Sequence, residues 1–288
     1  MLEFNLFRPQ SLQETLDLLA EFKGTARVLA GGTDLLISLR AKEGMEDVKN
    51  VIDITGLQEL AFIQERDLLE IGPLTTIAQV AEDSVLRQNA GVLAEAAAAV
   101  GSPQIRNRGT IGGNVVNAAV CADTVPPLVA LGATVKLERK GGSRWLPLDQ
   151  FITGPNRTQL AEDELLTKIA FAKLPANASW GFMRLARREA LAIARMNVAV
   201  IIVRDGQGKV EHARIVPGSV LSRPTGVPEA EKLLVGTHPD EALAHQAGEA
   251  VAAAMTSSGR RWSTPYKEPA IIALTERAIK QALEVEWR

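Results

Sequence analysis

Cysteine and histidine are scarce in this sequence. Its 288 residues include one cysteine, Cys121, and three histidines. A single thiol cannot form an internal disulfide, a cysteine-rich zinc site or an iron–sulfur cluster held by this chain alone. Three histidines also disfavour a histidine-based metal site. The sequence therefore predicts no metal held by this chain.

The sequence also lacks an excess of positive charge and long apolar runs. Its 32 Lys and Arg residues against 34 Asp and Glu give a formal net charge of -2, which argues against a nucleic-acid-binding surface. Apolar runs such as residues 93–100 are far shorter than a membrane-spanning helix. The first 22 residues have no basic start followed by an apolar core, so no signal peptide is predicted and a cytoplasmic location is expected.

The composition is that of a soluble globular protein, 46% hydrophobic and 23% charged, with enough length for two domains or one large one. Near the N-terminus, Ser11 is a candidate helix cap before a helix that ends near Gly24. The residues that follow predict a strand over 26–32, a helix over 33–44 and a strand over 48–55. This βαβ order is typical of parallel pairing.

The middle of the chain is less regular. Residues 68–72 predict a strand, and a helix should begin at Thr75 or Thr76. Residues 101–139 are rich in Gly, Asn and Thr and show little periodicity until a strand over 133–139. Irregular segments inside a compact domain are often functional.

A domain boundary is expected near residues 174–181, where Pro, Asn and Gly interrupt the pattern. Beyond it, two antiparallel strands should flank the turn at residues 205–208. Helices are expected over 229–236, 238–255 and 268–287, which predicts a small sheet packed with helices.

Two glycine pairs share a physical logic. In Gly31-Gly32-Thr33-Asp34 and Ile111-Gly112-Gly113-Asn114, consecutive small residues let successive backbone N–H groups converge on an anion. A helix starting at Thr33 or Asp34 would add its positive end, and a dinucleotide pyrophosphate fits this description. Each motif alone is also consistent with a plain turn and helix cap. Neither is a nicotinamide-type glycine fingerprint or a phosphate-binding loop.

Longer motifs extend the pattern. Three lie in the first part of the chain: LAGGTDLLI at 29–37, IGPLTT at 71–76 and PQIRNRGTIGGNVVNAAVCADTVPPLVALGA at 103–133. Two lie in the second part: RREALAIARMNVAV at 187–200 and PGSVLSRPT at 217–225. With these motifs the chain resembles, over nearly its whole length, the flavoprotein (medium) subunits of the molybdenum hydroxylases. That family includes xanthine dehydrogenase and aerobic carbon monoxide dehydrogenase.

The resemblance implies an α+β chain whose first domain is a vanillyl-alcohol-oxidase-like (PCMH-type) FAD-binding domain over residues 1–176. Its two subdomains would span about 1–56 and 57–176. A small C-terminal domain of the carbon monoxide dehydrogenase flavoprotein type, an antiparallel sheet with helices, would follow over 177–288. FAD would lie in a cleft between the two subdomains.

The resemblance also implies the cofactor-binding residues. Residues Leu29, Ala30, Gly31, Gly32, Thr33, Asp34 and Leu35 would surround the pyrophosphate. Thr110, Gly113 and Asn114 would form a second clamp, and Asp123 would accept hydrogen bonds from the sugar-like part of the cofactor. A helix N-cap is the other interpretation of Asp123. Leu165 or Leu166 would supply a backbone contact, and Arg184 would lie by the isoalloxazine, with a surface ion pair as the alternative.

No catalytic side chain is predicted, because the flavin carries the chemistry. The resemblance implies a large molybdenum-cofactor subunit and a small subunit with 2Fe-2S clusters as partners. It also implies NAD+ or another acceptor, and often a dimer of heterotrimers. The GGTD motif favours a xanthine or N-heterocycle dehydrogenase. A carbon monoxide dehydrogenase-type subunit, a self-contained FAD oxidoreductase and a non-catalytic scaffold subunit are the alternatives.

Overall fold

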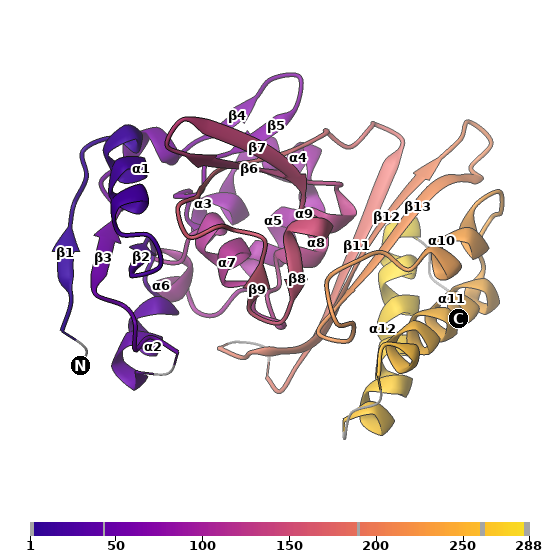
Figure 1. Ribbon diagram of the computed structural model, residues 1–288. Coiled ribbons are helices and arrows are strands. Elements are labelled where there is room, and N and C mark those ends of the chain that lie inside the picture. The colour runs from indigo at the N-terminus through magenta and orange to yellow at the C-terminus, as the bar shows by residue number, and fades with distance from the viewer. Residues whose placement is uncertain (1–2, 43, 189–190, 260–262, 285–288) are drawn as a thin grey trace.

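A computed structural model describes residues 3–42, 44–188, 191–259 and 263–284. Within these residues the main strands form three sheets, arranged in chain order across the molecule (Figure 1). The third sheet lies between the central part of the chain and the C-terminal helices.

The first sheet is parallel, as the βαβ pattern predicted. Its strands are β1 (Asn5–Phe7), β3 (Asn50–Asp53) and β2 (Ala26–Leu29), in that order. Helices α1 (Leu12–Glu21) and α2 (Leu35–Ala41) make the crossovers. The Ser11 hydroxyl caps α1 by accepting from Glu14 N at 3.2 Å. Helix α2 is shorter than expected, because the backbone turns left-handed at Lys42 (φ 61°).

The second sheet is antiparallel and has the strand order β4-β5-β10-β6-β7. Its strands are β4 (Ile63–Glu65), β5 (Leu69–Ile71), β6 (Thr134–Arg139), β7 (Gly142–Pro147) and β10 (Leu165–Phe171). A short ribbon, β8 (Ile152–Gly154) with β9 (Arg157–Thr158), lies beside it. The associated helices are η1 (Gln58–Leu60), α3 (Ile77–Glu82), α4 (Ser84–Asn89), α5 (Gly91–Ala98), α6 (Pro103–Arg106), α7 (Ile111–Asn117), α8 (Val125–Ala130) and α9 (Leu148–Phe151).

The irregular segment 101–139 is therefore folded as three short helices, α6 to α8, followed by strand β6. The capping box of α3 is complete: Thr76 Oγ1 accepts from Gln79 N, and Gln79 Oε1 accepts from Thr76 N. This fixes the start of α3 at Ile77, one residue after the expected cap.

The third sheet consists of β11 (Ala178–Ala186), β12 (Ala194–Arg204) and β13 (Val210–Gly218), all antiparallel. Helices α10 (Pro228–Leu234), α11 (Glu241–Ser257) and α12 (Thr264–Leu283) follow. Residues 285–287 of the last expected helix lie outside the described residues. The sequence analysis predicted two strands here and missed β11.

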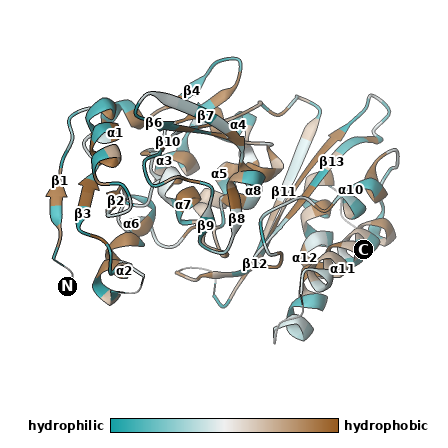
Figure 2. Cartoon of the chain, viewed as in Figure 1, coloured by the Kyte–Doolittle hydropathy of each residue, from teal (hydrophilic) through white to brown (hydrophobic). Residues whose placement is uncertain are grey.

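Both faces of the third sheet are covered, because side chains alternate along its central strand. Ala199 and Ile201 of β12 join the core around the second sheet, which is the core of what we call the FAD-side domain because the resemblance places the FAD-binding domain there. Val198, Val200 and Ile202 point the other way, into the core shared with α10 to α12. Hydrophobic residues accordingly run along these strands, and hydrophilic ones gather at turns and outer helix faces (Figure 2).

A candidate cofactor site between two glycine turns

The predicted site residues come from five places in the fold. Leu29 ends β2, Ala30 to Asp34 form a turn, and Leu35 begins α2. The remaining residues are Thr110 at the cap of α7, Gly113 and Asn114 within α7, Asp123 in the loop before α8, Leu165 and Leu166 at the start of β10, and Arg184 on β11.

The first turn presents consecutive backbone donors. The N–H groups of Gly31 to Leu35 donate to no acceptor in the described part of the chain. Gly32 has a φ of 76°, the left-handed conformation that favours glycine. The first helical hydrogen bond of α2 runs from Leu36 N to Gly32 O at 3.2 Å. A run of successive unpaired N–H groups around a left-handed residue is suited to holding an anion.

The second turn packs directly against the first. A Cβ atom on Gly31 would lie 2.1 Å from the carbonyl oxygen of Arg108 and 2.8 Å from Cα of Gly109. On the other side, a Cβ atom on Gly109 would lie 3.6 Å from Thr33 Oγ1. The lack of side chains thus lets two backbone segments about 75 residues apart touch.

The N–H groups of the second turn are already used inside the protein. Ile111 N donates to Thr75 O at 2.9 Å, and Gly112 N donates to Pro73 O at 3.0 Å. Gly113 N donates to the capping hydroxyl of Thr110 at 3.1 Å. This turn therefore differs from the first: it positions a helix and supports its neighbour, and it offers few free amides.

Asn114 is nevertheless oriented as a donor. Its Oδ1 accepts from the buried Thr124 hydroxyl at 2.6 Å. Its side-chain NH2 group donates to no acceptor among the described residues. Gly113, one residue earlier, is exposed. Together they present polar groups on α7, and Arg108 and Gly109, which precede this helix, contact the first turn.

Asp123 is buried at the junction of the two domains. It is 5% exposed. Its Oδ2 accepts from Arg184 Nε at 3.1 Å, and its Oδ1 accepts from Asn197 Nδ2 at 2.9 Å. Burial raises the pKa of Asp123, while the charge of Arg184 and the two hydrogen bonds act to lower it.

These contacts decide between the alternatives for two residues. Helix α8 starts at Val125 with Thr124 as its cap and no side-chain capping bond, so the N-cap interpretation of Asp123 is wrong. Arg184 does form an ion pair, but its side chain is only 11% exposed and the partner is Asp123. The sequence left a surface ion pair as the alternative for Arg184, but the ion pair that it forms is buried.

Cys121 connects the first turn to this ion pair. Its half-buried thiol has a raised pKa, because burial disfavours the thiolate and the charges of Asp123 and Asp34 add to the effect. Asp34 belongs to the first turn, so the two glycine turns, Cys121 and the Asp123–Arg184 pair all lie in one region.

Leu165 and Leu166 have buried side chains. Leu165 packs with α1 and the first sheet, and Leu166 packs in the central core. Their side chains are thereby committed to packing, and a backbone contact from this pair to a cofactor stays a prediction.

Sequence reasoning missed Asn197. It is fully buried on β12, directly opposite Arg184 of β11, and it binds Asp123. A signal was present, since it is the one polar residue in the apolar run Met196–Val203. The sequence could not show which strand would face it.

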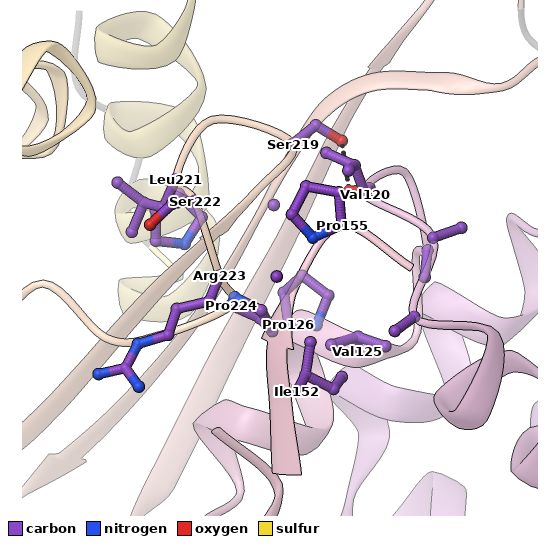
Figure 3. A pocket seen from close by; sticks show the side chains of 16 residues that line it. Val120, Val125, Pro126, Ile152, Pro155, Ser219, Leu221, Ser222, Arg223 and Pro224 are labelled. Carbon is purple, nitrogen blue, oxygen red and sulfur yellow. Dashed lines mark hydrogen bonds between the residues drawn. The ribbon is translucent and has the colours of Figure 1, made fainter. Parts of the chain in front are cut away.

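A separate depression lies beside the site (Figure 3). It encloses about 30 Å³ and holds about 410 Å³ with its open mouth, and its lining residues are 118–120, 122, 125–126, 152, 154–155, 217–219 and 221–224. Its walls are mainly alanine, valine and proline, and Arg223 points away from it. None of the predicted cofactor residues lines it, so it is distinct from the predicted site.

Two further features were searched for in the described residues. No cluster of three or more His, Cys, Asp or Glu side chains there could hold a metal ion. None of the described helices combines the length and the apolar character needed to cross a membrane.

Comparison with known proteins identifies the family. Residues 2–174 match the model of the FAD binding domain in molybdopterin dehydrogenase. Residues 181–282 match the CO dehydrogenase flavoprotein C-terminal domain. The chain belongs to the FAD-binding subunits of the molybdopterin dehydrogenases.

Similar proteins cover most of the chain. The nicotinate dehydrogenase FAD-subunit of Eubacterium barkeri is 36% identical over 82% of this chain and 81% of its own length. The xanthine dehydrogenase FAD-binding subunit of Escherichia coli O157:H7 is 30% identical, covering 96% and 94%. The structure of carbon monoxide dehydrogenase from Hydrogenophaga pseudoflava superimposes with a TM-score of 0.91 at 28% identity, covering 98% of both chains.

The described residues fit the FAD that the family binds. A pyrophosphate carries two negative charges, and the first turn offers five consecutive N–H groups that have no acceptor among the described residues. The α+β fold, with its FAD-binding and C-terminal domains, agrees with the expectation from the sequence.

Proposed function

We propose that this chain holds FAD between its two glycine turns and is the electron-transfer subunit of a molybdenum hydroxylase. The observation that carries the proposal is the row of N–H groups from Gly31 to Leu35, which have no acceptor among the described residues and belong to a turn that packs against the second glycine turn. We also propose the division into subdomains 1–56 and 57–176 and a C-terminal domain 177–288, which separates the three sheets.

Each group has a role that follows from its chemistry. Amides of the first turn would bind the pyrophosphate, with Thr110, Gly113 and Asn114 closing the other side. Asp123 would accept from hydroxyl groups of the sugar-like chain, because an ionised carboxylate only accepts hydrogen bonds. Arg184 would place a positive charge near the flavin ring, held in position by Asp123. The carbonyl of Leu165 or Leu166 would complete the contacts.

The bound FAD would supply the redox chemistry, taking electrons from iron–sulfur clusters of a partner subunit and giving them to NAD+ or another acceptor. The chain itself cannot hold such clusters, since it has one cysteine. A large molybdenum-cofactor subunit and a small 2Fe-2S subunit are the partners we propose, assembled as a dimer of heterotrimers. The names of the relatives, "FAD-subunit" and "medium chain", support a multi-subunit enzyme.

For the substrate of the whole enzyme we propose an N-heterocycle. The GGTD motif supports this, as do the substrates in the names of the nicotinate, xanthine and caffeine dehydrogenase relatives. The carbon monoxide dehydrogenase medium chain of Hydrogenophaga pseudoflava, 29% identical over 99% of this chain, represents the alternative.

The test is reconstitution. The full chain, produced alone, should bind one FAD and show a flavin spectrum, but it should not oxidise nicotinate or xanthine. Produced together with its molybdenum and iron–sulfur partners, it should support substrate-dependent NAD+ reduction, and loss of FAD should abolish that reduction. Substrate oxidation by the isolated FAD-loaded chain would instead indicate a self-contained oxidoreductase, and failure to bind FAD a scaffold.

A further inference from the structure

Asn197 is the least expected residue at the candidate site. It lies on β12 in the C-terminal domain and is fully buried. Its Nδ2 donates to Oδ1 of Asp123, which belongs to the FAD-side domain and lies 74 positions away in the sequence. Burying a polar amide in an apolar strand costs free energy through desolvation. The hydrogen bond of Asn197 to the other domain therefore needs a functional explanation.

The surroundings of Asn197 are built to accept it. Its neighbour on β11 is Arg184, and its neighbour on β13 is Gly218. A Cβ atom on Gly218 would lie 2.1 Å from Asn197 Oδ1, so any larger residue there would displace the amide. That oxygen is buried and has no hydrogen-bond partner among the described residues. The amide is therefore held by packing, with its NH2 end directed at Asp123.

We propose that Asn197 is a positioning residue for the cofactor site, which holds the Asp123 carboxylate ionised and oriented so that it can accept from FAD hydroxyls. This inference rests on the proposed role of Asp123 toward FAD. Arg184 engages one carboxylate oxygen and Asn197 engages the other. Both donors come from adjacent strands of the C-terminal sheet, so docking of that sheet sets the charge and orientation of a residue in the FAD-binding domain.

Asn197 counteracts the effect of burial on the pKa of Asp123. Burial raises the pKa of Asp123, and the donors Arg184 and Asn197 lower it. The other titratable or charged groups recorded nearby are Cys121 in the same loop and Asp34, which acts on Cys121 from the first turn. From α12, Lys267 reaches the same corner by donating to Ser219 O at 2.6 Å.

The experiment measures FAD affinity of the full chain by flavin fluorescence between about pH 4.5 and 8.5, a range chosen around raised carboxyl pKa values. In the unmodified chain, affinity should fall on acidification as Asp123 is protonated. Asn197→Leu keeps the branched shape and the number of side-chain heavy atoms but removes the donor. It should move the midpoint of this fall upward by about one pH unit, the size expected for a lost hydrogen bond to a charged group. Asp123→Asn should abolish the pH dependence, and adding Asn197→Leu to it should change nothing further.

Asn50→Leu is the matched control. Asn50 is also a buried asparagine that hydrogen-bonds, to Thr25 and Asn5, but it lies in the first sheet. It should lower the melting temperature and leave the midpoint in place. Asn197→Ser, which keeps a shorter donor, should give an intermediate midpoint.

The outcomes separate two failures. If Asp123→Asn removes a pH-dependent affinity and folded Asn197→Leu leaves its midpoint unchanged, this inference is overturned and the role of Asp123 stands. If the FAD affinity of the unmodified chain does not depend on pH, or if this dependence persists in Asp123→Asn, both the inference about Asn197 and the proposed role of Asp123 are overturned. Failure of both Asn197 variants to fold while Asn50→Leu folds would assign Asn197 a structural role alone.

Discussion

Gly31 and Gly32 are adjacent, but the structure requires a glycine at each position for a different reason. Gly31 permits contact between two backbone segments, and Gly32 adopts a left-handed φ of 76°. In Gly32 a Cβ atom would also meet the side chains of Leu29 and Leu36 at 3.1 Å. A substitution of Gly32 therefore combines backbone strain with crowding, and Gly31 is the cleaner position for a test.

Gly31→Ala should weaken FAD binding tenfold or more. The added Cβ would overlap Arg108 O, and the two turns would have to separate at a cost of about 1–3 kcal/mol. Flavin fluorescence titration measures the change. Gly56→Ala is the control, because a Cβ atom there meets nothing within 4 Å. Equal affinities for the two variants would mean that the contact between the turns does not shape the site.

Asp123→Ala should lower the free energy of unfolding by about 3 kcal/mol or more, because it leaves Arg184 buried without its carboxylate partner. The measurement is urea unfolding of the full chain without FAD. A loss below about 1 kcal/mol, the size seen for exposed pairs, would contradict the buried ion pair.

The neutral variant Asp123→Asn tests the sign of the pKa shift. The folded pKa lies above the ordinary value of 3.8, so this carboxyl contributes stability below 3.8 that is lost as the pH rises through the folded pKa. The unmodified chain should therefore lose stability relative to Asp123→Asn across that window. Urea unfolding at several pH values measures the difference, and the opposite slope would mean that the donors outweigh burial.

At the residue scale, the sequence predicted the two glycine turns from their local pattern and Asp123 from the family resemblance, and their contacts with FAD stay predictions. It could not identify Asn197 or the Gly31–Arg108 contact. Both depend on the pairing of segments that are distant in the sequence, and neither register nor close approach is encoded locally.

The elements around the site are short and held by their neighbours. Helices α2 and α7 have seven residues each, below the length at which an isolated helix is stable. Helix α7 is anchored by its Thr110 cap and by hydrogen bonds from Ile111 and Gly112 to the loop at residues 73–75. The first turn lacks such bonds, so we expect it to depend on the cofactor for order.

Helices α5 and α12 connect the two domains through a polar contact. Gln281 of α12 accepts from Phe182 N at 2.8 Å and donates to Glu95 of α5 at 3.4 Å. Burial raises the pKa of Glu95. Ionisation of the Glu95 carboxyl therefore lowers the free energy of unfolding at this contact.

Glu95→Gln should raise the free energy of unfolding at neutral pH by up to about 1 kcal/mol. The gain should shrink as the pH falls through the raised pKa and vanish below the ordinary value of 4.5, where Glu95 is protonated in both the folded and the unfolded chain. Urea unfolding at neutral and acidic pH measures this. Glu82→Gln, at an exposed position on α3, is the control and should show no such difference. A gain that persists at acidic pH would rule out the titration of Glu95 as its cause.

At the element scale, the βαβ unit and the C-terminal helices were predicted because their apolar residues recur with clear periods. Strand β11 was missed because both of its ends fall in segments rich in turn-forming or charged residues. The helices of residues 101–139 were missed because each is too short for a period to show.

At the scale of the whole molecule, the C-terminal sheet completes the site. One face packs on α10 to α12, the other face packs on the core around the second sheet, and strands β11 and β12 bring Arg184 and Asn197 to Asp123. The proposed cofactor site therefore draws residues from both of the proposed domains. The docking of the third sheet could not be predicted from the sequence, since it depends on which face each strand turns toward its neighbour.

The most direct test of the central claim is hydrogen–deuterium exchange of the full chain with and without FAD. The amides of Gly31 to Leu35 have no acceptor in the part of the chain that the structure describes, so they should exchange quickly without FAD and become protected when it binds. Ile111 and Gly112 already donate to protein carbonyls and should change little. FAD binding that protects other segments and leaves residues 31–35 exchanging at the same rate would contradict the account.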